Sequence, residues 1–297
     1  MSFFLQCNLP NFTSTKTPKI MKTIIVATDL SKDANNALEY AAALARCTNA
    51  KLVLYNSFVI PPHAANTLLP ASEIEKIIAS NKASLEYIAL KTKCTYDVPV
   101  ECISKLSEIQ SELDRLVVEY DADLVVMGMR GETLDQRLFG NTTTSIIHHA
   151  KYPVLVVPID AKFKGMSKIL FACDDNCHSA SKTLVKLKEI AAEMSAEVQV
   201  LHVQKLLKKA DLVLVEELAG LHPHDESFSG LNHTYRDIDG CSIIEGIEKG
   251  IKEFNADLLV MVPQKHGLWD SLLHRSKTCA MASRSKVPLL SIPFGKN

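Results

Sequence analysis

The stretch Lys22-Thr-Ile-Ile-Val-Ala-Thr-Asp29 occurs a second time in this chain, as Ser167-Lys-Ile-Leu-Phe-Ala-Cys-Asp174. Each copy is a short, almost continuous apolar run that ends in an acidic residue. Such a run is typical of a strand buried on both faces of a parallel sheet. Two further segments recur in the same order, residues 122–127 as 256–261 and residues 151–158 as 286–293. Three matched segments in one order predict a duplicated domain.

The length of 297 residues also suits two domains of ordinary size. We predict a disordered extension over residues 1–20, a first domain over 21–160 and a second domain over 161–297. The apolar residues near the start, Phe3-Phe4-Leu5, are too few for a secretory signal, and no basic residue precedes Lys16.

Within each predicted domain, short β-rich runs alternate with longer helical patterns. Ser31 is a candidate N-cap for the first helix, and further helices are predicted over 72–91, 106–120 and 142–149. The predicted fold class is α/β, with two tandem Rossmann-like domains, each a five-stranded parallel sheet flanked by helices. The expected strands are 23–28, 52–57, 98–102, 123–127 and 154–157, then 168–172, 198–203, 231–236, 258–262 and 289–292.

Composition excludes several function classes. Lys and Arg number 33 against 34 Asp and Glu, which predicts no nucleic-acid partner because phosphate contacts require clustered excess base. No apolar run approaches the roughly 18 residues that span a bilayer, so no membrane partner is expected. The eight cysteines contain no CxxC pair, which favours free thiols and a cytoplasmic location.

A glycine-rich loop follows the fourth predicted strand, reading Gly128-Met-Arg-Gly131 and, after eight residues, Gly140-Asn-Thr-Thr143. Glycines let backbone N–H groups approach an anion, and a helix that opens at Gly140-Asn141-Thr142 directs its free amides toward the same anion. Arg130 can add charge, and Asn141, Thr142 and Thr143 can add hydrogen bonds. The alternative interpretation is a plain turn with a helix cap.

The loop, together with residues 24–31 and 149–158, resembles the universal stress protein (UspA) family, in tandem over residues 21–297. ATP-binding members carry G-x2-G-x9-G-[ST], and this chain has G-x2-G-x8-G-N. The resemblance implies an adenine nucleotide alpha-hydrolase-like fold and a site for ATP with Mg²⁺. By position, the glycine pattern holds the phosphates and ribose, Asp29 lies near the nucleotide, and Met127 with Tyr55 or Asn56 holds adenine.

The second predicted domain lacks this loop. In an ungapped alignment, Gly128, Gly131 and Gly140 correspond to Val262, Lys265 and His274, and Pro263 removes a backbone donor. We therefore expect a degenerate domain that does not bind ATP through this loop. Its one distinctive segment, around Trp269, is interpreted as a core or inter-domain helix.

Two residue sets could hold zinc, but a solvated turn and ordinary packing are the favoured interpretations. They are His222, His224 and Asp225, and Cys173, Cys177 and His178. Neither a G-x-S-x-G elbow nor a Walker lysine is present. Asp29 is the only plausible positioner of Mg²⁺ or water, so any ATPase activity should be slow.

The sequence thus predicts a cytoplasmic ATP-binding stress-response and signalling module with unknown protein partners. A slow ATP hydrolase or nucleotide-dependent enzyme of the same fold is one alternative, and a nucleotide-free scaffold is another. The last strands of the two domains, 154–157 and 289–292, should pair about a pseudo-twofold axis, because an open apolar edge is an aggregation liability. The chain would then be an intramolecular pseudo-dimer, with further homodimerisation left open.

Overall fold

The structure is a computed structural model that describes residues 21–58, 70–129, 141–173, 181–205, 228–240, 242–263 and 277–293. Its strands are β1 (Thr23–Ala27), β2 (Lys51–Phe58), β3 (Val100–Leu106), β4 (Leu124–Met129), β5 (Val154–Pro158), β6 (Lys168–Cys173), β7 (Glu197–Lys205), β8 (His233–Gly240), β9 (Leu258–Met261) and β10 (Leu289–Ser291). Its helices are α1 (Lys32–Thr48), α3 (Ala71–Tyr96), α4 (Ile109–Glu119), α5 (Asn141–His149), α6 (Ser181–Met194), α7 (Ile243–Phe254) and α8 (Lys277–Arg284).

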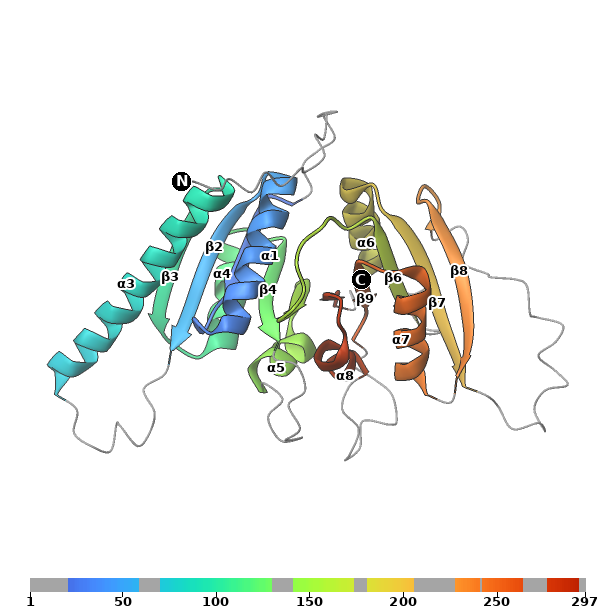
Figure 1. Ribbon diagram of the computed structural model, residues 1–297. Coiled ribbons are helices and arrows are strands. Elements are labelled where there is room, and N and C mark those ends of the chain that lie inside the picture. Colours follow the sequence, from blue (N-terminus) through green and yellow to red (C-terminus); the bar gives the residue numbers. More distant parts are fainter. Residues whose placement is uncertain are drawn as a thin grey trace, which may run out of the picture.

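The described strands form one sheet in the order β3-β2-β1-β4-β5-β10-β9-β6-β7-β8 (Figure 1). The predicted α/β class with parallel strands between helices is confirmed. The order β3-β2-β1-β4-β5 recurs in the second half as β8-β7-β6-β9-β10, with every pair parallel inside each half. The two halves meet where β5 and β10 pair antiparallel, with Leu290 opposite Leu155, so the predicted pairing of the two final strands is observed.

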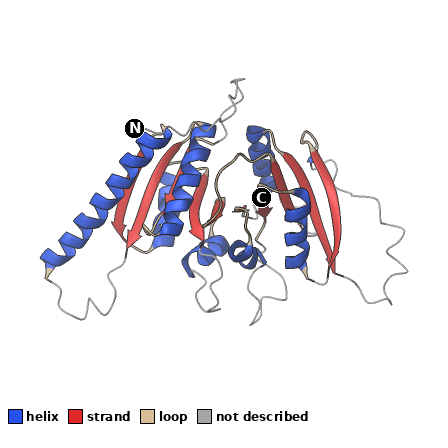
Figure 2. Cartoon of the chain, in the orientation of Figure 1, coloured by secondary structure: helices blue, strands red, loops and turns tan. Residues whose placement is uncertain are grey.

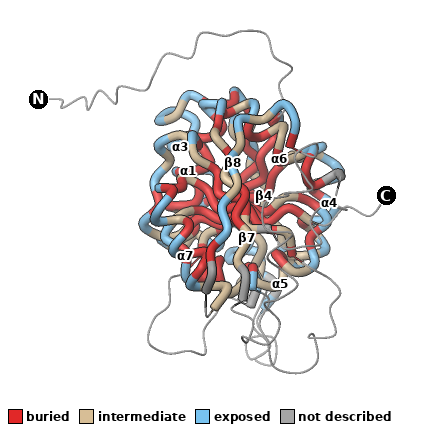
Figure 3. Tube along the Cα trace, turned by 90° about the vertical axis from the view of Figure 1, so that its right-hand side faces the viewer, coloured by how far each residue is buried: buried red, intermediate tan, exposed pale blue. Residues whose placement is uncertain are grey.

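Helices cover both faces of this sheet (Figure 2). On one face α1, α3 and α6 pack their apolar residues against the strands, and on the other face α4, α5, α7 and α8 do so. The central strands are buried from both sides, and the exposed segments lie outside them (Figure 3). Burial on both faces explains why these strands read as continuous apolar runs.

The outer strand β3 and the helix α4 that follows it depart from the predicted bounds. It runs from Val100 to Leu106 instead of 98–102, and α4 begins at Ile109 instead of 106. An edge strand has a solvent side that accepts polar residues such as Lys105, so it continues beyond the apolar run. The following helix starts only where the Glu108 carboxylate accepts hydrogen bonds from the N–H groups of Gln110 and Ser111.

Equivalent aspartates hold the start of each half. Asp123 Oδ2 accepts the backbone N–H groups of Lys22 and Thr23 at 2.7 and 3.1 Å. Asp257 Oδ2 accepts those of Ser167 and Lys168 at 2.9 and 3.0 Å. These contacts join the β4–β1 and β9–β6 pairs at their amino ends, so the sequence repeat is also a repeat of hydrogen bonds.

The connection between the halves is fixed on α1. The buried Asn36 side chain donates from Nδ2 to the carbonyl oxygens of Pro158 and Ala161, at 2.8 and 2.9 Å. Its Oδ1 accepts a 2.7 Å hydrogen bond from Lys162 Nζ.

Below the sheet centre, α5 and α8 lie together, and Cys279 Sγ donates to Thr144 O at 3.6 Å (Figure 1).

Candidate functional site

The carboxyl ends of β1 and β4 mark the place where the strand order of the first half reverses. These strands are adjacent, with Ala27 opposite Met127. From β1 the chain proceeds outward to β2, and from β4 it proceeds the other way to β5. Open α/β sheets bind ligands in the crevice beyond such a reversal, so the loops that follow β1 and β4 are the candidate site.

The loop after β1 is a tight turn that presents Asp29. The Thr28 hydroxyl accepts the Leu30 N–H at 3.0 Å, and Leu30 adopts a left-handed φ of 64°. Asp29 Oδ1 accepts the Ser31 N–H at 2.9 Å, and Ser31 Oγ accepts the Ala34 N–H as the predicted N-cap of α1. Asp29 is exposed, so its carboxylate retains acceptor capacity for a ligand.

Gly128 is not a loop residue, and this prediction was wrong. It belongs to β4, opposite Val157 on β5, and the strand continues to Met129. A Cβ at Gly128 would lie 2.7 Å from the backbone carbonyl of Asp33 and 3.0 Å from Ala34 N. The first turn of α1 crosses β4 here, and it leaves no room for a side chain at position 128.

Tyr55 is also placed differently from the prediction. The strand β2 continues to Phe58, so Tyr55 does not end it. The Tyr55 side chain is fully buried, with its hydroxyl 3.1 Å from Ser107 Oγ, and its carbonyl accepts the Thr28 N–H at 2.8 Å. Met127 is buried as well, at 4% exposure. Only backbone atoms of these two residues could contact a ligand.

Asn56, the alternative to Tyr55, has an unusual environment. It is 3% exposed, and its Nδ2 donates a 2.8 Å hydrogen bond to the carbonyl oxygen of Thr28. Its Oδ1 has no hydrogen-bond partner among the described residues. Ser104 is directly opposite on β3, and its buried Oγ also has none among them. Buried polar atoms are nearly always paired in native proteins, so this pair requires an explanation.

The helix after the glycine loop begins at Asn141. Thr142 is exposed at its first turn, whereas Thr143 is buried and directs its hydroxyl to the carbonyl oxygen of Gly128 at 3.4 Å. Of the predicted phosphate ligands, Thr142 is therefore the available hydroxyl. Arg130, Gly131, Gly140 and the Asn141 side chain lie outside the described residues.

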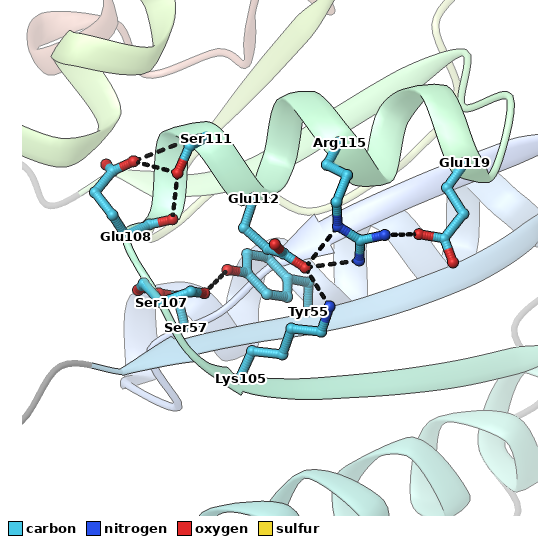
Figure 4. A network of polar contacts seen from close by, with 9 residues as sticks. All are labelled: Tyr55, Ser57, Lys105, Ser107, Glu108, Ser111, Glu112, Arg115 and Glu119. Atoms are coloured by element: carbon cyan, nitrogen blue, oxygen red, sulfur yellow. Dashed lines mark hydrogen bonds and ion pairs between the residues drawn. The ribbon is translucent and has the colours of Figure 1, made fainter.

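A polar network that the sequence analysis missed surrounds the end of β3 (Figure 4). Ser107 joins Tyr55 and Ser57, with the Ser57 hydroxyl donating to the Ser107 carbonyl at 2.5 Å. Glu112 Oε1 accepts from Lys105 Nζ at 2.6 Å and from Arg115 at 2.7 Å, and Arg115 also contacts Glu119. The spacing of Glu112, Arg115 and Glu119 along one helix face was the available signal.

This network should make stability depend on acid pH. Hydrogen bonds from Arg115 and Lys105 lower the pKa of Glu112 to about 2. A lowered folded-state pKa gives stabilisation that is complete above the ordinary glutamate range and is lost as the pH falls toward 2. We expect Glu112→Gln to lower the free energy of unfolding at pH 7 by about 1 kcal/mol and to reduce its fall between pH 5 and 2.

Urea unfolding across this pH range measures both effects. The control is Glu86→Gln, whose carboxylate lies 3.9 Å from Lys82 on the exposed surface of α3. An exposed pair of this kind should change stability by less than about 0.5 kcal/mol. Equal pH profiles for the wild type and Glu112→Gln would contradict the assignment.

Other candidate chemistry has little support in the described part of the chain. Its side chains include no group of three His, Cys, Asp or Glu residues suited to a metal ion. None of its helices is both long and apolar enough to span a bilayer. The two residue sets that were considered for zinc, and not favoured, fall largely outside the described residues, as do Lys265, Trp269 and His274. Val262, which aligns with Gly128, directly follows β9 and is partly buried.

Comparison with known proteins shows which family and which fold this chain resembles. Residues 21–158 match the sequence profile of the Universal stress protein family. This part of the chain belongs to that family. Universal stress protein G of Shigella flexneri is 38% identical over 53 residues, which are 18% of this chain and 37% of that protein. Universal stress protein G of Salmonella typhimurium is 34% identical over 53 residues, which are again 18% of this chain and 37% of that protein. The chain thus spans little more than a third of these curated relatives.

The fold of both halves resembles that of a solved universal stress protein structure. The crystal structure of a universal stress protein from Archaeoglobus fulgidus covers 92% of this chain and 98% of its own, with a TM-score of 0.70 and 20% identity. At this identity the likeness concerns the fold, and it includes both halves. The universal stress protein domain at residues 21–158 therefore occupies one half of a two-part sheet.

Proposed function

We propose that the first half binds an adenine nucleotide, ATP with Mg²⁺, and that its occupancy changes a surface read by a protein partner. The protein would then be a binding and signalling module of the cytoplasm, where Cys47, Cys94, Cys102 and Cys279 would remain thiols that form no disulfide. The second half would contribute the other part of the sheet and no second ATP site of this type.

The observation that carries the proposal is the buried Oδ1 of Asn56, which has no hydrogen-bond partner among the described residues. The Thr28 carbonyl can only accept a hydrogen bond, so it fixes the amide with Nδ2 inward and Oδ1 as the remaining atom. A buried acceptor without a donor costs about 1–3 kcal/mol. The exocyclic amino group of adenine is such a donor, and the Ser104 hydroxyl beside Asn56 can donate to a ring nitrogen.

The remaining contacts come from the two loops beyond the strands. Thr142 and the free amides at the start of α5 suit phosphate oxygens, and the glycine pattern of residues 128–140 supports the same role. The exposed Asp29 carboxylate suits the magnesium ion that accompanies ATP. Bound ATP would supply the phosphate oxygens and the magnesium ion that these groups contact. The residues of the chain would bind and orient the nucleotide.

Asn56→Leu tests this proposal. The substitution keeps a similar volume but removes the acceptor, so we expect ATP affinity to fall about tenfold or more, corresponding to one buried hydrogen bond. GTP, whose base carries an oxygen at the same ring position, should bind the wild type weakly and show no such loss. Isothermal titration of the purified protein measures both affinities.

Asn81→Leu is the control, because the Asn81 amide donates only to Ile77 O on the exposed face of α3. Its ATP affinity should equal that of the wild type. Equal ATP affinities for Asn56→Leu and the wild type would remove Asn56 from the site. No measurable binding of any adenine nucleotide to the wild type would refute the proposed function.

A further inference from the structure

The helix α3 has an apolar face on the side opposite to the one that packs against the sheet. On the packed side, Leu85 and Ala89 are 1% and 7% exposed. On the outer side, Tyr87 and Leu90 are 70% and 62% exposed. Figure 1 shows α3 at the end of the first half that is remote from the second half. Large apolar side chains that gather on one exposed face of a folded protein mark an interaction surface.

The exposed residues follow the spacing of a helix that packs against another helix. Ala83, Tyr87, Leu90 and Cys94 are separated by four, three and four residues, and all four are exposed. We call these four residues the outer stripe of α3. This is the heptad spacing of a helix–helix contact, and it extends over about 17 Å at 1.5 Å per residue. The next position toward the amino end is the polar Ser80, where the outer stripe stops.

The residues beside the outer stripe have a charge pattern that is complementary to itself. Glu86 and Lys93 lie seven residues apart on one flank, and Ser84 and Lys91 lie on the other. When two copies of such a helix pack antiparallel, each flank faces the same flank of the second copy. Glu86 of each copy then meets Lys93 of the other, twice because of the twofold symmetry. Lys91 meets the uncharged Ser84.

We propose that two copies of the chain associate through the outer stripes of their α3 helices, packed antiparallel about a twofold axis. Tyr87 of each copy packs against Leu90 of the other, and Ala83 lies opposite Cys94. The antiparallel order also aligns the two helix dipoles favourably. Three turns of helix bury less than the roughly 800 Å² per partner of a standard complex, so the dissociation constant should be about 100 μM.

This contact is separate from the pairing of β5 with β10 inside one chain. The outer strand β3, on which α3 packs, is at one end of the first half, and β5 is at the other end. Association through α3 would therefore join two complete chains and leave the pairing between their halves unchanged. It also requires no nucleotide, so it is independent of the proposed ATP site.

Sedimentation equilibrium of the full-length protein measures the association. The wild type should be mostly monomeric at about 10 μM and mostly dimeric at about 500 μM. Leu90→Glu should abolish the dimer, because the contact with Tyr87 would bury a carboxylate. The position is exposed in the single chain, so folding should be retained. The control is Val118→Glu, at an 82% exposed position of α4, which should leave the dissociation constant unchanged. A wild type that stays monomeric at about 500 μM, or a dimer that Leu90→Glu leaves intact, would refute the proposal.

Charge reversal tests the antiparallel order. Glu86→Lys and Lys93→Glu should each weaken the association about tenfold, because like charges would then face each other twice. The double substitution should restore the affinity of the wild type. Lys91→Glu is the control and should have little effect, since Lys91 faces Ser84. If Lys91→Glu instead weakens the dimer and rescues Glu86→Lys, the helices pack parallel and the proposed order is wrong.

A disulfide tests the distances across the contact. Positions 83 and 94 of one helix are about 17 Å apart, too far for a disulfide within one chain. In the proposed dimer, position 83 lies opposite the exposed Cys94 of the second copy. Mild oxidation of the Ala83→Cys protein at about 500 μM should therefore produce dimers linked between positions 83 and 94, as identified by mass spectrometry. Dimers linked only between identical positions, or no linked dimers, would contradict the antiparallel contact.

Discussion

Gly128→Ala is expected to lower the free energy of unfolding of the nucleotide-free protein by about 3 kcal/mol, near the upper end for overpacked positions. The added Cβ would lie 2.7 Å from the carbonyl carbon and oxygen of Asp33. These are backbone atoms in the first turn of α1, and no side-chain rotation relieves the overlap. The helix must move away from β4 and lose contacts of its fully buried residues, such as Ala37 and Ala41. Denaturant unfolding without ligand measures the loss.

The matched control is Gly250→Ala on α7. There the new Cβ would meet Leu201 Cδ2 at 2.7 Å, which is the end of a flexible side chain. Replacing a helical glycine by alanine also gains about 1 kcal/mol of helix propensity, so the net change should be small. If instead Gly128→Ala leaves stability unchanged and impairs only ATP binding, Gly128 serves the ligand and α1 does not need the space.

The case of Gly128 shows why the fold was more predictable than the site. A strand such as β1, apolar along its whole length and buried on both faces, is visible in the sequence because burial itself selects its residues. The sequence repeat also made the pairing of β5 with β10 predictable, because both are apolar strands that end a domain. A glycine after an apolar run, however, is equally consistent with a phosphate loop and with a helix crossing. Only the position of Asp33 distinguishes the two.

The atoms of the candidate site depend on registers between distant residues. Asn56 and Ser104 become neighbours because β2 and β3 pair in one register, and nothing local to either residue specifies it. From the sequence, Asn56 is therefore predicted only as an alternative to Tyr55, and Ser104 is not predicted at all. The Lys105–Glu112 contact depends in the same way on where α4 begins. Polar side chains on a partly exposed edge strand give no periodic signal that fixes such details.

The two halves share the same scaffold, but the residues at the carboxyl ends of their equivalent strands differ. Asp123 and Asp257 make the same backbone contacts in both, and the strand order is repeated. At the carboxyl ends of the strands, Asn56 and Ser104 in one half correspond to His202 and Asp237 in the other. Residues that support the sheet are thus the same in both repeats, and residues at the carboxyl ends of the strands differ, as expected if function resides on loops and strand ends.

Residues 21–160 expressed alone are expected to form a dimer with twice the mass of the single fragment. In the full chain, β10 covers β5 through the pairs Leu289–Val156, Leu290–Leu155 and Ser291–Val154. Val154 to Val157 are at most 1% exposed, so removing the second half would leave an apolar edge open to water. Because β5 and β10 pair antiparallel about a pseudo-twofold axis, a second copy of β5 can take the place of β10 in a symmetric interface.

Light scattering after size-exclusion chromatography measures this mass over a range of concentrations. The control is the fragment 21–297, in which β10 still covers β5, so that its mass should equal that of the full chain apart from the missing extension. Dissociation of the 21–160 dimer on dilution should be accompanied by loss of folded structure, because the edge strand is also part of the core through Val156. A fragment that stays folded and monomeric at high concentration would show that β5 does not need a partner strand. The antiparallel seam would then be a consequence of the covalent link between the halves and not a source of their stability.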